Sequence, residues 1–182
     1  MLYFTADPHF GHANIIRHCD RPFLNVAEMD ETLLQNWFYP GPEDDLYILG
    51  DLMYYCKTPQ WYLDRLHSAR LHLIVGNHDR VWMSKVDNWQ SHFVEVAPMV
   101  TLTLDGRELL LCHDPEEALP LLNPHQTLVY GHIHNDTTLP VWESLLALGD
   151  RALNAGVDIN GFRPVTFERM LKNNRAFRID FE

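Results

Sequence analysis

Residues that can bind metal ions follow short apolar runs at five places along the chain. The side chains with suitable oxygen or nitrogen donors at these places are Asp7, His9, Asp51, Asn77, His113, His132 and His134. Open α/β sheets bind their ligands in the crevice at the carboxyl ends of their strands. If each apolar run is a strand, the five strand ends are therefore expected to converge on one site.

The number and type of these donors indicate two metal ions rather than one. Seven protein ligands are too many for one zinc-like ion, which usually takes three or four. If one carboxylate bridges, the seven side chains give eight bonds, four for each of two ions. Two ions about 3.5–4 Å apart clamp the attacking and leaving oxygens of a phosphoryl transfer. Imidazole and carboxylate without thiolate suit Mn, Fe, Zn or Ni better than Ca or Cu(I).

The apolar runs predict buried strands of about four or five residues each. They are Leu2–Ala6, Leu46–Leu49, Leu71–Val75, Leu109–Cys112 and Thr127–Tyr130. Helical patterns alternate with these runs. One helix is expected to begin at Asn25, where Glu28 can complete a capping box, and another at Thr58, which precedes a proline. This alternation predicts a layered α/β fold with two sheets covered by helices.

The second half of the chain adds a hairpin and a terminal helix to this scheme. Val94–Asp105 and Glu108–Cys112, joined by a turn at Gly106, predict two antiparallel strands. A helix is expected from Thr166 through Lys172, with a last strand near Ala176–Phe181. With 182 residues and no internal repeat or linker, the chain is expected to form one domain over residues 1–182.

Composition and cysteine usage indicate a globular protein of the cytoplasm. Apolar residues make up 46 % of the chain, yet no apolar run approaches the ~18 residues needed to span a bilayer. The chain opens on Leu2–Ala6 without a basic segment, so no secretory signal is expected. Cys19, Cys56 and Cys112 are odd in number and lack CxxC spacing. This argues for a reducing compartment and against both a disulfide framework and a thiolate metal site.

The charge of the chain limits the partners that it can bind. With 14 basic and 25 acidic residues, the formal net charge is −11, which argues against a long nucleic acid held along a basic groove. Small phosphorylated substrates remain compatible, because bound cations can supply the largest local charges in a site. A membrane partner is not expected, and the sequence leaves the oligomeric state open.

The metal-ligand candidates also form an ordered set of motifs. Asp7-x-His9, Gly50-Asp51, Gly76-Asn77-His78-Asp79, His113 and Gly131-His132-x-His134 span nearly three quarters of the chain. In this order they resemble the motifs of the calcineurin-like metallophosphoesterases, and the opening segment looks most like a small microbial branch of them. The resemblance implies a four-layer α/β/β/α sandwich of two mixed sheets with helices on the outer faces. It further implies that Asp7, His9 and His134 bind one ion, that Asn77, His113 and His132 bind the other, and that Asp51 bridges.

Several neighbouring residues are candidates for contacts with a substrate. His78 follows the ligand Asn77, so its side chain should point elsewhere, where it can protonate a leaving oxygen; Asp79 is its nearest carboxylate in sequence. General acid catalysis of this kind contributes roughly 10²–10⁴-fold. Further candidates for binding the phosphate are His12, Asn14, Arg17 and Arg80. Capping, surface and salt-bridge roles remain open for these four residues.

Together these features predict a dinuclear metal-dependent phosphoesterase, in which a metal-bridging hydroxide attacks phosphorus in line. Small phosphodiesters such as aryl diesters or cyclic nucleotides are favoured, with two divalent ions, Mn²⁺ before Fe, Zn or Ni. The alternatives are a phosphomonoesterase or nucleotide phosphatase on the same site, and a non-catalytic metal-binding interaction module. A protein Ser/Thr phosphatase is disfavoured, because the GDxVDRG motif of that class is replaced by Gly50-Asp51-Leu52-Met53-Tyr54-Tyr55.

Overall fold

Two four-stranded sheets form the centre of the molecule in the computed structural model, which describes residues 1–37, 40–66 and 69–179. The first sheet has the order β1-β2-β3-β4 and is parallel throughout. Its strands are β1 Leu2–Thr5, β2 Asp45–Leu49, β3 Arg70–Ile74 and β4 Glu95–Ala97. The second sheet has the order β5-β6-β7-β8, with β5 antiparallel to β6 and the other pairs parallel. Its strands are β5 Met99–Leu104, β6 Arg107–Cys112, β7 Gln126–Tyr130 and β8 Ala152–Asn154.

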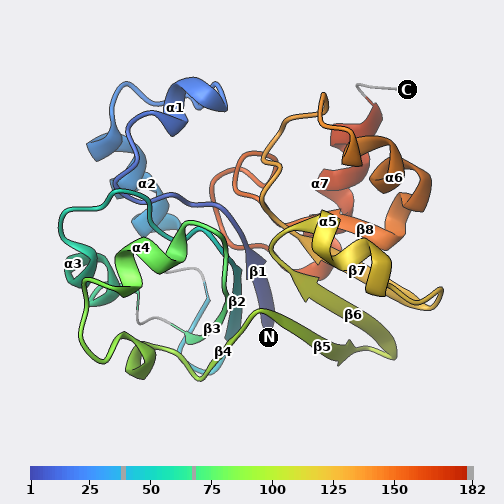
Figure 1. The fold of residues 1–182 in the computed structure, drawn as a ribbon, viewed down its shortest axis with the longest axis horizontal. Coiled ribbons are helices and arrows are strands. Elements are labelled where there is room, and N and C mark those ends of the chain that lie inside the picture. Colours follow the sequence, from blue (N-terminus) through green and yellow to red (C-terminus); the bar gives the residue numbers. More distant parts are fainter. Residues whose placement is uncertain (38–39, 67–68, 180–182) are drawn as a thin grey trace.

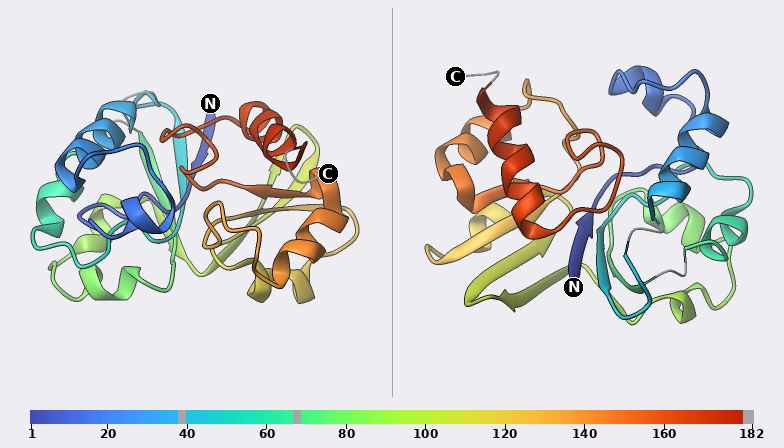
Figure 2. Two further views of the ribbon diagram at one scale, coloured as in Figure 1. Left: turned by 90° about the horizontal axis from the view of Figure 1, so that it is seen from above. Right: turned by 180° about the vertical axis from the view of Figure 1, so that it is seen from behind.

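Helices cover the outer side of each sheet (Figure 1). Beside the first sheet are α1 Ile15–His18, α2 Val26–Trp37, α3 Pro59–Leu63 and α4 Asp79–Met83. Beside the second sheet are α5 Pro115–Ala118, α6 Val141–Leu148 and α7 Phe167–Ile179. Short 3₁₀ turns complete the list at Trp89–His92, Leu119–Leu121 and Gly149–Arg151. Seen from above, the order of layers is helices, sheet, sheet, helices (Figure 2), which confirms the layered sandwich.

Three apolar clusters hold these layers together. One fills the space between the first sheet and α2–α4, with Met29, Leu33 and Trp82 at 5 % exposure or less. A second lies between the sheets and joins residues of both, such as Phe4 and Val129. The third lies under α5 and α6 on the far side of the second sheet. Burial on both faces explains why most of the central strands are continuous apolar runs rather than alternating ones.

Helix α7 departs from the outer-face arrangement because its first turns help to close the core between the sheets. Its residues Phe167 and Met170 belong to the same cluster as Phe4 of β1. Farther along, Asn174 accepts a hydrogen bond from the Asn154 backbone N–H at 2.7 Å and so fixes the end of β8. The helix therefore connects the two sheets near the point where β8 ends.

The expected helix starts agree with the structure, but their caps differ. Asn25 Oδ1 accepts from the Glu28 backbone N–H at 3.0 Å, as the capping box requires. The Glu28 carboxylate accepts from the Leu24 N–H at 2.7 Å, one residue before the expected partner. Thr58 precedes α3, although its side chain makes no capping hydrogen bond, and Pro59 supplies the first turn.

Two expectations about the arrangement of the strands need correction. Val94–Asp105 is not one strand: it breaks at Pro98, so that β4 joins the first sheet and β5 the second. Proline lacks the N–H that a continuous ladder needs. The first sheet is wholly parallel rather than mixed.

The end of the chain differs as well. Helix α7 continues to Ile179 over part of the strand expected at Ala176–Phe181, whose remaining residues lie outside the described ones. Strand β8 was not expected, because only three residues pair there and such a short run gives little periodicity.

Two compositional expectations can be compared with the structure. Cys19, Cys56 and Cys112 are buried and free. Among the described residues, none of the helices has the length and apolar character needed to cross a membrane.

Candidate metal centre

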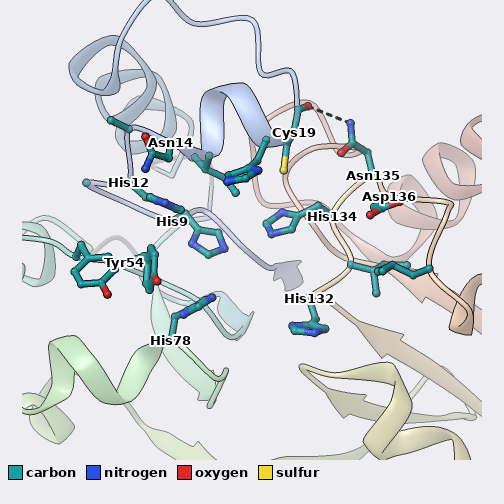
Figure 3. Close-up of a pocket in the computed structure, with 17 residues that line it drawn as sticks. His9, His12, Asn14, Cys19, Tyr54, His78, His132, His134, Asn135 and Asp136 are labelled. Atoms are coloured by element: carbon teal, nitrogen blue, oxygen red, sulfur yellow. Dashed lines mark hydrogen bonds between the residues drawn. The ribbon is translucent and has the colours of Figure 1, made fainter.

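The ends of five strands bring the seven predicted ligands together at one edge of the two sheets. Asp7 and His9 follow β1, Asp51 follows β2, and Asn77 follows β3. From the second sheet come His113 after β6 and the pair His132 and His134 after β7. Figure 3 shows His9, His78, His132 and His134 facing a common space. Both sheets thus contribute to one centre, as their strand ends predict.

Three of these residues form what we call the His9 site: Asp7, His9 and His134. One ligand atom from each lies within 4.8 Å of the others. Asp7 and His9 are almost completely buried. Asp7 Oδ2 accepts from the His132 backbone N–H at 2.9 Å, while Asp7 Oδ1 has no hydrogen-bond partner. The uncommitted oxygen therefore remains available to a cation.

The second group, which we call the His113 site, comprises Asn77, His113 and His132. Its His113 Nε2 lies 3.0 Å from Asn77 Oδ1 and 3.3 Å from His132 Nδ1. The other ring nitrogen of His113, Nδ1, donates to the Leu49 carbonyl at 2.7 Å. Because the carbonyl can only accept, Nδ1 keeps its proton, and Nε2 is the ring nitrogen that faces the site.

Asp51 lies between the two sites. Its Oδ2 is 3.6 Å from His9 Nε2 and 3.5 Å from His113 Nε2. Asp51 also groups with His113 and His132 within 4.8 Å. A single carboxylate oxygen therefore lies at similar distances from one imidazole of each site.

The backbone at the centre is unusual, because five of the seven residues have left-handed conformations. The φ angles are 56° at Asp7, 54° at His9, 53° at Asp51, 70° at His132 and 51° at His134. Non-glycine residues rarely adopt positive φ, and each instance costs of order 1 kcal/mol or more. Such strain is typical of functional sites, where the surrounding fold enforces side-chain directions that relaxed strands would not give.

Glycines before the ligands permit the strand ends to approach closely. A Cβ atom at Gly76 would lie 2.3 Å from Asp51 Oδ1, and one at Gly131 would lie 2.6 Å from Asp7 Oδ2. Both distances are far below any van der Waals contact. Gly76 is therefore explained by Asp51 at the end of the neighbouring strand β2, and Gly131 by Asp7, which follows β1 in the other sheet.

The charges of the centre favour cation binding. Burial lowers the pKa of His9 well below its usual range, so this imidazole is neutral, the form that binds metals. Both of its ring nitrogens are buried without a hydrogen-bond partner. Burial also raises the pKa of the Asp7 carboxyl. Native proteins seldom leave buried polar atoms unpaired. Bound cations would satisfy Asp7 and His9 together, so the residues fit a metal centre.

Comparison with known proteins adds independent evidence. No protein-family model matches the chain. It is 30 % identical over 175 residues to the uncharacterized protein MJ1445 of Methanocaldococcus jannaschii, covering 94 % of this chain and 89 % of that protein. A crystal structure of the Aquifex aeolicus protein of unknown function AQ665 aligns with a TM-score of 0.74 and 25 % identity, over 94 % and 98 % of the two chains.

A characterised relative is found over part of the chain. Phosphodiesterase YfcE of Escherichia coli K12 is 35 % identical over 111 residues, which cover 54 % of this chain and 56 % of YfcE. The fold of this chain brings the ordered motifs together in one centre. This chain belongs to the calcineurin-like metallophosphoesterases. Because the match spans only a little over half of YfcE, it does not by itself transfer the activity of that enzyme.

This metallophosphoesterase holds His134 with a buried ion pair that sequence reasoning missed. His134 Nδ1 donates to Asp158 Oδ2 at 2.9 Å, and Arg21 Nε donates to Asp158 Oδ1 at 2.7 Å. The Arg21 guanidinium also donates to the backbone carbonyls of Asp7 and Pro8 at 2.8 and 2.9 Å. Burial disfavours ionisation of Asp158, but hydrogen bonds from His134 and Arg21 outweigh it and lower the pKa of the carboxyl. Arg21 and Asp158 lie outside the motifs, so the spacing of the motifs does not predict their roles.

Asp79 has a structural role rather than the role of orienting His78. Its carboxylate accepts from three backbone N–H groups, those of Gly76, Asp51 and Leu52, at 2.8–2.9 Å, and from Trp82 Nε1 at 2.7 Å. These bonds tie the end of β3 to the end of β2. His78 instead lies with Nε2 3.8 Å from Asp51 Oδ2 and with its ring centroid 4.0 Å from that of Tyr54.

The four candidate substrate-binding residues fall in different places. His12 and Asn14 line a cavity of about 750 Å³ together with His9, His78 and His134. Arg80 lines a second hollow of about 510 Å³ beside Asn77 and His113. Arg17 is exposed on α1 and lines neither hollow. Helix α1 turns Ile15 inward, so Arg17, two positions on, points to another side.

Proposed function

We propose that this chain is a metal-dependent phosphoesterase that hydrolyses small phosphodiesters, with two divalent ions and a preference for Mn²⁺. The observation that carries the proposal is the position of Asp51 Oδ2, 3.6 and 3.5 Å from imidazoles of the two sites. The unpaired Asp7 Oδ1 and His9 nitrogens support it. In this proposal Asp7, His9 and His134 hold one ion, Asn77, His113 and His132 hold the other, and Asp51 contacts both.

Divalent ions bound there would supply positive charge for the phosphoryl oxygens and lower the pKa of a water molecule. The chain itself supplies a candidate proton donor for the leaving group, His78. His78 is about one third exposed, with its side chain at 34 %, and lines the cavity next to the site. From there its imidazole can donate a proton to the departing ester oxygen. The Tyr54 ring packs against it and limits its movement.

The surroundings of the site favour diesters over monoesters. The centre borders two hollows. His9, His132 and His134 line the first, together with His12 and Asn14, and Asn77 and His113 line the second, together with Arg80. A diester carries two substituents on phosphorus, and each hollow can receive one. Diesters also carry a single negative charge, which the acidic chain, at −11, repels less than a dianion.

The experiment is a comparison of two substrates with one metal. The protein is stripped with a chelator and reloaded with Mn²⁺, and the ions bound per chain are counted. We expect two ions and a higher kcat/KM for bis-p-nitrophenyl phosphate than for p-nitrophenyl phosphate. The stripped protein should hydrolyse neither. A preference for the monoester would indicate a phosphomonoesterase, and metal binding without hydrolysis of either ester would indicate an interaction module.

A further inference from the structure

An exposed aromatic side chain next to the metal centre suggests what kind of substituent the diester carries. We propose that Tyr55 stacks on the base of a nucleoside whose phosphate occupies the metal centre. This inference rests on the proposed function and adds the chemical class of the substrate. It is carried by the placement of Tyr54 and Tyr55 along the wall of the larger cavity.

Aromatic rings form a continuous path from the metal centre to Tyr55. His78 Nε2 lies 3.8 Å from Asp51 Oδ2, and the His78 ring centroid is 4.0 Å from that of Tyr54. The next step is from Tyr54 to Tyr55, whose centroids are 4.4 Å apart. In a nucleotide the sugar separates the phosphate from the base. The sugar would therefore lie along His78 and Tyr54, and the base would reach Tyr55.

The Tyr55 ring is exposed although the loop that carries it is firmly anchored. Tyr55 is 69 % exposed, whereas its neighbours Met53 and Cys56 are almost completely buried. Met53 forms a bridge with Phe10, and the Tyr54 N–H donates to the Phe10 carbonyl at 3.3 Å. A buried residue on each side holds the loop in place. The exposed ring is therefore presented on a fixed support rather than on a free loop.

Tyr55 also has a positive φ, 50°. A left-handed conformation is a genuine outlier for a bulky residue. The surrounding structure must enforce it, and such outliers occur at binding sites. The conformation turns the ring outward beside the cavity instead of into the apolar core under α2–α4. An aromatic ring with a strained backbone and little burial is explained by a partner that covers it.

The size and the lining of the cavity fit a single nucleotide unit. Its volume of about 750 Å³ lies within the range of sites for small ligands. Asn14 lies on the same side of the cavity as Tyr54, opposite Asn135 and Asp136 (Figure 3). The Asn14 side chain makes no capping bond to α1, so its amide can bond to the edge of a base. The net charge of −11 disfavours a longer polyanion.

Two diesters with the same leaving group test this inference. They are the p-nitrophenyl ester of thymidine 5′-phosphate and methyl p-nitrophenyl phosphate, each assayed with the Mn²⁺-loaded protein. We expect the thymidine ester to have the higher kcat/KM. The ratio of the two values should fall about 10-fold in Tyr55→Ala, because one base–aromatic stacking contact is lost. Tyr55→Phe should keep the ratio, since it keeps the ring.

Trp61→Ala serves as the matched control, because Trp61 is also a partly exposed aromatic residue, at 42 %, but lies outside the cavity. It should keep the ratio of the native protein. Melting temperatures show whether each variant is folded. If Tyr55→Ala hydrolyses the methyl ester and keeps the native ratio, the stacking role is wrong and the phosphoesterase proposal stands. If the Mn²⁺-loaded native protein hydrolyses neither ester, the proposed function fails and the inference fails with it.

Discussion

In the His9 site the imidazole of His134 is held by Asp158, which is itself paired with the buried Arg21. In the His113 site the imidazole of His113 is held by a main-chain carbonyl, that of Leu49. The first support comes from side chains, and the second from the main chain at the end of β2 in the other sheet. The same type of ligand is thus oriented in two different ways within one centre.

The sites also differ in charge and in contact with solvent. The His9 site contains a buried carboxylate, Asp7, and a second carboxylate stands behind His134. The His113 site contributes the neutral amide of Asn77 and the His132 side chain, which is 37 % exposed. More negative charge and less solvent favour tighter cation binding. We therefore expect the ion of the His113 site to exchange more readily than the ion of the His9 site.

Asp51→Asn is expected to have the largest effect, because Asp51 faces both sites. The substitution keeps the shape of the side chain but removes a charge that both ions would share. Hydrolysis should fall to background and at least one ion should be lost per chain. Activity assays and metal counting measure this. Native activity with two ions still bound would show that Asp51 does not bridge.

His78→Ala should separate chemistry from metal binding. His78 lies beside Asp51 but belongs to neither site, so the variant should keep both ions. Its kcat should fall by about 10²-fold or more, because a proton donor for the leaving group is lost. Kinetics and metal content are measured on the same preparation. Loss of metal in proportion to activity would instead make His78 a ligand or a structural residue.

Asp158→Asn and Asn77→Ala form a matched pair that tests the difference between the sites. Asp158→Asn should weaken the binding of one ion by about 10–100-fold, because a partner of a ligand is lost. Asn77→Ala should weaken the binding of the other ion at least as much, because a ligand itself is lost. Calorimetric titration with Mn²⁺ should show the tighter step weakened in Asp158→Asn and the weaker step in Asn77→Ala. Equal weakening of both steps in both variants would show that the sites are not independent.

The pH dependence of the metal-free protein should be a smaller effect. Burial opposes protonation of both histidines, but Asp51 raises the pKa of His113 to about 9, and Asp7 and Asp158 raise that of His134 to about 11. Both values exceed the usual 6.5, so the folded state binds more protons than the unfolded state above this pH. The stabilisation is complete below pH 6.5 and is lost as the pH rises through 9 and then 11.

Thermal unfolding of the metal-free protein should therefore show a melting temperature that falls from about pH 7 upward. The Mn²⁺-loaded protein is the control, and it should not show this fall, because bound metal replaces the protons on these imidazoles. A flat profile for the metal-free protein would contradict the raised values.

The sequence predicted the parts of the centre that stand at strand ends. Each of the seven ligand candidates directly follows a strand or lies within a few residues of its end, and ordered spacing was enough to find them. Arg21 and Asp158 were missed because their contact joins residues 137 positions apart, and no local periodicity records such a pair. Arg17 is close to the first motif in sequence, but the turn of α1 leaves its side chain exposed and outside both hollows.

The fold shows the same division between local and distant information. Strands with long apolar runs were found, whereas β8 has only three residues and depends on β7 and α7 for its place. Pro98 lies between strands of different sheets. Its effect on the ladder is local, but the separation of the sheets is decided by packing across the whole molecule. Sequence therefore indicated the residues at the strand ends more completely than it indicated the contacts that support them.

The break at Pro98 also divides the chain into two nearly equal segments. Residues before it build the first sheet and carry Asp7, His9, Asp51 and Asn77, and residues after it build the second sheet and carry His113, His132 and His134. Each candidate ion site combines residues of both segments. Bound ions would therefore clamp the two sheets together, so that the cohesion of the molecule would rise and fall with the free metal concentration around it.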